Sequence, residues 1–298
     1  MIAVCIGGGI VLKAARLIPG DAHKGINIWI LYMALPAMSF TYIPKIQWSV
    51  QMLFPAISSL IVWTGSWLFM ELYCTCKKYG QRSRSTLELT SGYSNTSFIG
   101  FPLIAAYFGE QYLSIAIICD QMGFILLSTA GIVSAAKADR KGRRKADTAK
   151  VLKKLITFPP FIGCISALLM GRFFDLSFAE PFFRKLSSTV GPLALFSVGL
   201  QLKFKGWKQF MSQLSAAMLY KLLIAPALVL VAALIVGIRS DIARISIFEA
   251  AMPALISASI VIEQFNLNIR LANQIVGFGI LLGFITTAFW DVLLHWLI

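Results

Sequence analysis

The sequence predicts an all-helical protein that crosses a membrane many times, and three observations carry this prediction. Hydrophobic residues make up 58 % of the 298 residues, and charged residues make up 13 %, against about 25 % in a soluble domain. The mean hydropathy is +0.77. Apolar stretches of about 20 residues, long enough to span a bilayer, recur along the chain. The predicted fold is therefore ten transmembrane helices in two inverted five-helix repeats, with helices 4 and 9 broken and crossing.

Hydropathy delimits ten apolar segments, and each is expected to be a spanning helix. They cover residues 1–15, 26–43, 51–73, 87–108, 112–136, 153–173, 186–202, 212–237, 243–264 and 270–297, numbered below as spans 1 to 10. Lys13 and Arg16 follow the first segment, whereas a cleaved signal peptide carries its basic residues before its apolar region. Span 1 is therefore expected to be a helix that stays in the membrane.

Membrane topology accounts for the net charge of +14. Most Lys and Arg residues fall in the odd-numbered connections between spans, above all in the run from Lys137 to Lys154. Because basic loops stay on the cytoplasmic side, these connections are predicted to be cytoplasmic and both termini to lie outside a plasma or inner membrane. The lipid bilayer is thus the expected surrounding, and no nucleic-acid partner is predicted.

The basic linker 137–154 separates residues 1–136 from residues 155–298, and each part holds five predicted spans. An odd number of spans reverses the orientation of the second part, which predicts an inverted repeat. Interruptions recur at a nearly constant offset: Pro36 matches Pro192, Pro102 matches Pro253, and Asp120-Gln121 matches Asn273-Gln274. Matching interruptions in two repeats are a sequence pointer to a binding site at the membrane midplane.

Span 4 carries polar and helix-breaking residues where a plain spanning helix would carry Leu and Val. Asn95, Thr96, Gly100 and Pro102 lie near its middle. Pro102 removes a backbone donor and Gly100 allows the chain to turn, so two half-helices are expected with the break at these residues. The N-terminal end of the second half should favour an anion, because its N–H groups are unpaired. The alternative is a simple proline kink.

Span 9 contains the matching interruption at Met252-Pro253, among small residues that include Ser257. Small side chains let two helices approach closely, which suits two broken helices that cross. Glu249 lies one turn before Pro253. A carboxylate at membrane depth is a functional candidate by default, but this one is also close enough to the span end to reach a water-filled vestibule.

Asp120 and Gln121 lie within span 5 and form the second candidate group, with Asn273 and Gln274 as their uncharged counterparts in span 10. A buried carboxyl that exchanges a proton can couple transport to a proton gradient. Its alternative role is a hydrogen bond between packed helices. Lys221, inside span 8, could neutralise a substrate carboxylate, pair with a buried acid, or extend to the membrane surface. Glu88 is expected to be solvated.

The sequence offers no pattern typical of catalysis or metal binding. His23 and His295 are its only histidines, and both lie at span ends. Cys74 and Cys76 form a Cys-x-Cys pair without a nearby His, which is a weak metal signal. We therefore expect no enzyme, no metal and no cofactor beyond a coupling H⁺ or Na⁺.

At these residues the sequence resembles the auxin efflux carrier family, which includes plant auxin exporters and bacterial malate or malonate permeases. The matching pieces are Leu35-Pro36-Ala37, Asn95 to Leu103 with Phe108-Gly109, Pro192 with Ser197 to Leu200, and Ala250 to Ala254. The resemblance implies ten spans in two inverted repeats, broken helices 4 and 9 at the midplane, and organic-anion transport by an elevator-like motion. Sodium–bile acid symporters share this architecture. The short linker 137–154 differs from the long loop of many plant exporters, so a bacterial-type relative is favoured.

Taken together, the sequence predicts a secondary transporter for a small organic anion, a mono- or dicarboxylate. The predicted substrate-binding residues are Asn95, Thr96, Gly100, Pro102, Met252, Pro253 and Ser257, and the predicted coupling residues are Asp120, Gln121, Glu249, Asn273 and Gln274. Small apolar residues of spans 2 and 7 are expected to line the rest. Three alternatives stay open: a sodium-coupled symporter of the bile-acid type, a passive channel, and a receptor without transport. The substrate and the assembly, including a homodimer, also stay open.

Overall fold

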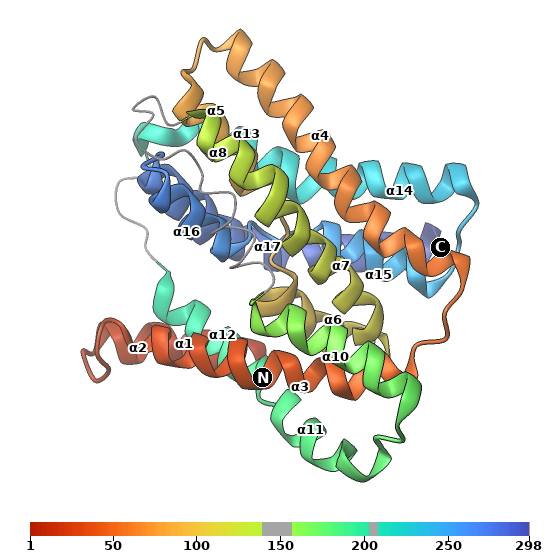
Figure 1. Ribbon diagram of the computed structural model, residues 1–298. Helices are drawn as coiled ribbons and strands as arrows, with labels where there is room; N and C mark the ends of the chain where they lie inside the picture. The colour runs from red at the N-terminus through yellow and green to blue at the C-terminus, as the bar shows by residue number, and fades with distance from the viewer. Residues whose placement is uncertain (139–156, 203–207, 298) are drawn as a thin grey trace. The chain divides into compact units, whose positions relative to one another are not determined.

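The computed structural model describes residues 1–138, 157–202 and 208–297, and these ranges are helical without a β-strand (Figure 1). The one β-type pairing in these ranges is an isolated antiparallel bridge between Ser94 and Ala254. Most of the predicted linker 137–154 lies outside the described residues; only Lys137 and Ala138 fall within them. The predicted all-helical class is thus confirmed for the described parts of the chain.

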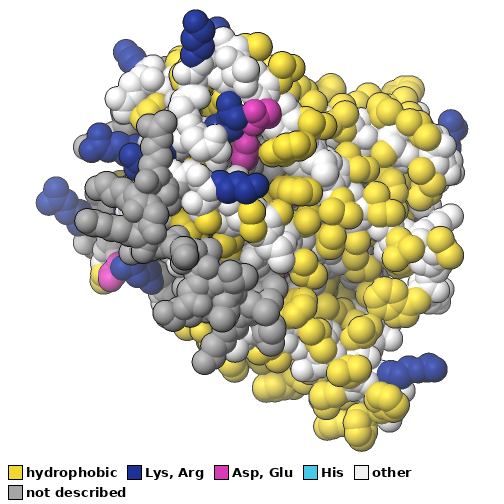
Figure 2. All heavy atoms as spheres, turned by 45° about the horizontal axis from the view of Figure 1, so that its top comes forward, with side chains coloured by type: hydrophobic (Ala, Val, Ile, Leu, Met, Phe, Trp, Pro, Cys, Tyr) yellow, Lys and Arg dark blue, Asp and Glu magenta, His cyan; other side chains and the backbone are white. Residues whose placement is uncertain are grey.

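Several of the helices are suited to a membrane by length and composition. Within the described ranges, five helices are long and apolar enough to cross a membrane: Ala22–Lys45, Val50–Cys76, Glu110–Ala138, Lys208–Val236 and Ile269–Leu297. Shorter apolar helices cover Ile2–Ala14, Thr96–Tyr107 and Pro159–Phe173. Large apolar side chains such as Trp67 and Ile285 are exposed, and hydrophobic side chains cover much of the face in Figure 2. The chain is therefore a polytopic membrane protein, while the number of ten spans and the inverted repeat stay predictions.

Packing divides the chain into two compact units, and each draws helices from both halves of the sequence. The first unit comprises Met1–Trp48, Ser97–Ile117 and Lys154–Leu202, and the second comprises Ser49–Thr96, Ile118–Lys153 and Lys203–Ile298. The two units are groups of residues that pack together, whereas the predicted repeats 1–136 and 155–298 are stretches of sequence expected to share one fold. The division into units therefore does not test the repeats. What it does establish is that span 4 changes unit at Thr96, directly after its polar residues begin.

In its described residues, the first unit contains seven helices and the start of an eighth, α7 (Leu113–Leu126). The seven are α1 (Ile2–Ala14), α2 (Ala22–Trp29), α3 (Leu35–Tyr42), α6 (Phe101–Tyr107), α10 (Pro159–Phe173), α11 (Glu180–Ser187) and α12 (Val190–Gln201). A π-helical turn, η1 (Ile30–Ala34), precedes Pro36 in the first turn of α3. A wider turn makes room for a proline ring that would otherwise strike the preceding carbonyl. Pro36 then packs on α10, where a Cβ added to Gly163 would lie 2.7 Å from its Cα.

Two glycines allow α1 and α12 to approach closely within the first unit. A Cβ added to Gly9 of α1 would lie 2.5 Å from the Phe196 carbonyl oxygen, and one added to Gly199 of α12 would clash with the Ile6 carbonyl oxygen. Because both obstacles are backbone atoms, a side chain cannot be accommodated by a rotamer change. This close contact is the small-residue packing that membrane helices favour.

Gly9→Ala is therefore expected to destabilise the protein by about 1–3 kcal/mol through overpacking. Gly7→Ala on the same helix is the matched control, because a Cβ on Gly7 would meet nothing within 4 Å. Thermal unfolding of both purified variants in detergent measures the difference. Equal melting temperatures for the two variants would contradict the close approach of α1 and α12.

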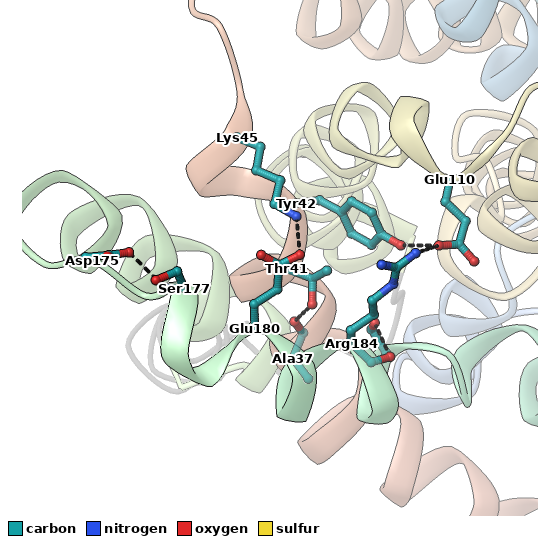
Figure 3. A network of polar contacts seen from close by, with 10 residues as sticks. Ala37, Thr41, Tyr42, Lys45, Glu110, Asp175, Ser177, Glu180 and Arg184 are labelled. Atoms are coloured by element: carbon teal, nitrogen blue, oxygen red, sulfur yellow. Dashed lines mark hydrogen bonds and ion pairs between the residues drawn. The ribbon is translucent and has the colours of Figure 1, made fainter.

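A polar network at one end of the first unit connects α3, α11 and the turn before α7 (Figure 3). Lys45 Nζ donates to Glu180 Oε1 at 2.5 Å, the Tyr42 hydroxyl donates to Glu110 Oε2 at 3.2 Å, and Arg184 Nη2 lies 3.7 Å from the same oxygen of Glu110. The hydrogen bond and charge of Lys45 lower the pKa of the Glu180 carboxyl. Both partners of this pair are exposed, so it adds little to stability.

The part of the second unit that the structure describes contains the rest of α7 and eight further helices. These are α4 (Phe54–Cys76), α5 (Gln81–Ser91), α8 (Ile132–Ala138), α13 (Met211–Leu219), α14 (Ala225–Val236), α15 (Asp241–Ala250), α16 (Ile256–Gln264) and α17 (Ile269–Leu297). A π-turn, η9 (Tyr220–Ile224), joins α13 to α14. The Tyr220 hydroxyl donates to the Val62 carbonyl of α4 at 2.6 Å, and Trp290 Nε1 of α17 donates to the Leu222 carbonyl at 2.9 Å. These two bonds hold the π-turn between α4 and α17.

Candidate functional site

Span 4 is broken, but not at the proline. Helix α5 ends at Ser91, residues 92–95 are not helical, and a π-turn, η4 (Thr96–Gly100), then leads directly into α6. Gly100 has helical dihedrals (φ −62°, ψ −53°) and Pro102 stands in the first turn of α6. The prediction that Gly100 and Pro102 form the break was therefore wrong. The π-turn absorbs the proline ring, as η1 does before Pro36, and the chain unwinds upstream at Gly92 to Asn95.

Span 9 is broken at the predicted proline. Helix α15 ends at Ala250, residues 251–255 are not helical, and α16 begins at Ile256. Pro253 lies in the middle of this unwound segment and is buried, as is Met252. Gly283 of α17 makes room for it, because a Cβ there would lie 3.2 Å from Pro253 Cδ. Two unwound segments thus lie in the second unit, one from each half of the sequence.

The two unwound segments pair with each other through their backbones. The Asn95 N–H donates to the Pro253 carbonyl at 2.8 Å, and the Leu255 N–H donates to the Tyr93 carbonyl at 3.0 Å. Ser94 and Ala254 form the antiparallel bridge between these two bonds. Irregular backbone at membrane depth must have its polar groups satisfied inside the protein, and this short pairing does so. We call residues 92–95 together with residues 251–255 the crossing.

Two polar side chains at the crossing are buried without a side-chain hydrogen bond among the described residues. Asn95 is 0 % exposed, and neither its amide oxygen nor its amide nitrogen is hydrogen-bonded there. Glu249, in the last turn of α15, is 1 % exposed, and both of its carboxylate oxygens are also without a hydrogen bond. A buried polar group left unsatisfied costs about 1–3 kcal/mol. Groups of this kind mark the place where a bound molecule or ion would supply the missing contacts.

Asp120 contacts Thr96, the first residue of the second half of span 4. The Thr96 hydroxyl donates to Asp120 Oδ1, and the Gln121 amide lies 3.4 Å from Oδ2. Asp120 is 9 % exposed, and its charge acts on Glu249 of α15. The structure therefore brings together Asn95, Thr96 and Asp120, which the sequence placed in two different roles.

Lys221 is a further buried residue of the site, and its position differs from the surface position that a lysine in a span usually takes. It belongs to the π-turn η9 and is 0 % exposed. Its ammonium donates to Ser94 Oγ at 2.8 Å and to the Ala250 carbonyl at 2.7 Å. Of the roles left open by the sequence, extension to the membrane surface is excluded.

A small cavity of about 20 Å³ lies beside the crossing within the second unit. Its polar lining includes Ser58 and Ser59 of α4, Ser94, Thr96 and Glu249. A space of this size holds a single water molecule or ion. A larger cavity of about 500 Å³ is lined by Trp63, Trp67, Glu88 and Tyr93 among others. Tyr93 lines both cavities, so it stands between them.

The other predicted site residues are distributed more widely. Ser257 is half-buried on α16, Gln274 is buried on α17 and Asn273 of the same helix is exposed. Gly100 and Pro102 belong to the first unit. Glu88, expected to be solvated, is instead 9 % exposed and accepts a 2.5 Å hydrogen bond from Ser134. Ser58, Ser59 and Ser91 were not singled out from the sequence, because Ser is common in membrane helices and its pattern there carries no distinct signal.

Comparison with known proteins gives matches over nearly the whole chain. Residues 1–291 match a family described as "Membrane transport protein". An uncharacterized transporter of Methanocaldococcus jannaschii is 27 % identical over 290 residues, covering 94 % of this chain and 90 % of the relative. A Rhizobium meliloti protein named "Putative malonate transporter" is 25 % identical over 264 residues, covering 84 % and 81 %. Auxin efflux carrier component 3 of Arabidopsis thaliana is 29 % identical over 183 residues, covering 57 % of this chain and 29 % of that protein.

Proposed function

Because the chain belongs to the membrane transport protein family, which includes the auxin efflux carriers, we propose that it is a secondary transporter for a small organic anion. The substrate class is a mono- or dicarboxylate, and transport proceeds by alternating access of an elevator type. The observation that carries this proposal is the unpartnered Asn95 amide at the crossing. The Rhizobium meliloti relative, whose name carries malonate, supports the same substrate class.

The chemistry of the crossing favours a carboxylate. Asn95 stands directly before the turn η4, with which the second half of span 4 begins, and the N–H groups at the N-terminal end of a helix carry a partial positive charge. An amide donor together with such N–H groups can bind both oxygens of a carboxylate. Met252 and Pro253 give the crossing apolar surroundings, in which these hydrogen bonds gain strength. Thr96 and Ser257 are the remaining proposed substrate contacts from the second unit.

The division into two packed units supports an elevator mechanism. Such a mechanism needs one body that carries the site and another that stays fixed in the bilayer. The crossing lies wholly within the unit formed by Ser49–Thr96, Ile118–Lys153 and Lys203–Ile298. We propose that this unit carries the substrate. We also propose the inverted repeat, a location in the cell membrane and external termini for this carrier.

Exchange in proteoliposomes tests this function. Purified protein is reconstituted with unlabelled malonate inside, and uptake of labelled malonate is compared with that of acetate, succinate and longer carboxylates. Saturable uptake stimulated by internal substrate is expected for at least one of them. Flux that does not saturate would indicate a channel, binding without flux would indicate a receptor, and uptake driven only by a sodium gradient would indicate a sodium symporter. Each of these results would overturn the proposal.

Asp120 is the proposed coupling residue, so Asp120→Asn is expected to abolish the pH dependence of exchange. Its carboxyl can take up and release a proton next to Thr96, whereas an amide cannot. Two other ionisable groups face the same region, Glu249 from α15 and Lys221 from η9. Exchange is measured from pH 5 to pH 8 with Glu249→Gln as the comparison. Full pH dependence in Asp120→Asn would remove Asp120 from this role.

A further inference from the structure

The ammonium of Lys221 bonds at once to the unwound part of span 4 and to the end of α15, directly before the unwound part of span 9. One acceptor, Ser94 Oγ at 2.8 Å, belongs to the unwound part of span 4. The other acceptor, at 2.7 Å, is the carbonyl of Ala250, which is the last residue of α15. Span 9 begins to unwind directly after it. With no exposed surface, the ammonium is withdrawn from bulk water. A charge in this position needs compensation from the protein around it.

The π-turn explains why Lys221 points inward. A π-turn holds more residues than an α-helical turn, so it changes the face on which its side chains lie. Pro226, in the first turn of α14, follows this turn, just as Pro36 follows η1 and Pro102 follows η4. The bonds of Tyr220 and Trp290 to neighbouring helices fix the turn. Lys221 is therefore held in place by the backbone around it and is not a flexible side chain that happens to be buried.

The oxygens around Lys221 are of the types that a small hard cation takes as ligands. They are the Ser94 hydroxyl and the Ala250 carbonyl, which the ammonium already engages, and the Glu249 carboxylate, which lacks a hydrogen bond in the described parts of the chain. Hydroxyl, carbonyl and carboxylate oxygens together form a typical ligand set for such ions. The charges of Lys221 and Glu249 act on each other, and Glu249 also lines the 20 Å³ cavity beside the crossing.

We propose that Lys221 is a tethered cation, whose ammonium occupies the position that a free sodium ion would take at the crossing. The wild-type protein then binds no sodium there, because the Lys221 side chain fills the position. Removing the side chain is expected to leave an oxygen-lined site that accepts a small cation from solution. This inference rests on the proposed function and extends it, because a carrier with a lysine in the cation position would transport its organic anion without sodium. The cation position itself rests only on the contacts of Lys221.

Thermal unfolding of the purified protein in detergent tests the proposal with Na⁺ itself as the probe. Wild type and Lys221→Ala are compared in choline chloride and in sodium chloride of equal ionic strength. Sodium is expected to raise the melting temperature of Lys221→Ala by about 2 °C or more and to leave that of wild type unchanged. Methylammonium, which resembles the lost group, is expected to act on the variant in the same way.

Two controls make the result specific. Lys13→Ala removes another lysine that donates to two carbonyls, those of Leu200 and Leu202, and it should gain no response to sodium. Adding Glu249→Ala to Lys221→Ala should abolish the gained response. Sodium stabilisation of wild type, or indifference of Lys221→Ala to both cations, would overturn the proposal. If Lys221→Ala does not fold, Lys221→Gln takes its place under the same criteria. No organic anion is present, so either outcome leaves the proposed anion transport to its own test.

Discussion

Asn95→Ala is expected to raise the malonate concentration for half-maximal exchange by about 10- to 100-fold. A hydrogen bond to a charged group contributes about 1.5–3 kcal/mol, and each 1.4 kcal/mol changes affinity tenfold. In the structure the Asn95 amide is fully buried and has no partner among the described residues, so the proposed substrate is the group that it serves. Initial rates of labelled malonate exchange over a range of concentrations give the measurement.

The stability of Asn95→Ala separates a binding role from a structural one. Since the amide makes no hydrogen bond within the described parts of the chain, its loss should leave the melting temperature unchanged or raise it. Asn273→Ala, which truncates an exposed asparagine of α17, serves as the comparison and should affect exchange less. A melting temperature that falls together with exchange would show that Asn95 holds the fold, and the proposed carboxylate contact would then be lost.

Leu255→Pro is expected to abolish exchange and to lower the stability by about 1–3 kcal/mol, the cost of leaving a buried carbonyl without its donor. The Leu255 N–H is one of the two backbone donors that close the crossing, and its acceptor is the Tyr93 carbonyl at 3.0 Å. Leu255 has φ −65°, which is the value that a proline ring imposes. The substitution therefore removes the N–H without forcing the backbone into a new conformation.

Leu255→Ala is the matched control, because it shortens the side chain and keeps the N–H. It should retain most of the exchange activity and unfold at a higher temperature than Leu255→Pro. Exchange rates and melting temperatures of both variants decide the matter. If the proline variant transports as well as the alanine variant, the pairing of the two unwound segments is not needed for function.

The sequence indicated that spans 4 and 9 are each interrupted, since both combine several unusual residues within short stretches of apolar sequence. Pro253 lies in the unwound part of span 9, as predicted. Pro102 does not lie in the unwound part of span 4, because the π-turn η4 admits it into a continuous helix. Whether a proline unwinds a helix or is absorbed by a wider turn depends on what packs around it. That information comes from distant residues and is absent from the local sequence.

The buried lysine was harder to predict for a similar reason. Lys221 is surrounded in sequence by Tyr, Leu and Ile, and this pattern is equally typical of a lysine that reaches the membrane surface. Its inward position depends on a π-turn and on acceptors contributed by the unwound part of span 4 and by α15. Glu88 was likewise predicted to be solvated, because the sequence does not show that Ser134 of α8 lies next to it and donates a hydrogen bond to it. Polar partners from other helices decide these cases.

The crossing is made by main-chain atoms, since Asn95 and Leu255 contribute their N–H groups and Tyr93 and Pro253 their carbonyls. Every amino acid except proline carries that donor, and every amino acid carries that acceptor. Mutations can therefore exchange side chains at the crossing without removing the backbone hydrogen bonds that join its two segments. Such a backbone frame tolerates change in evolution: single substitutions can alter the side-chain chemistry of the crossing while the geometry of the break is inherited.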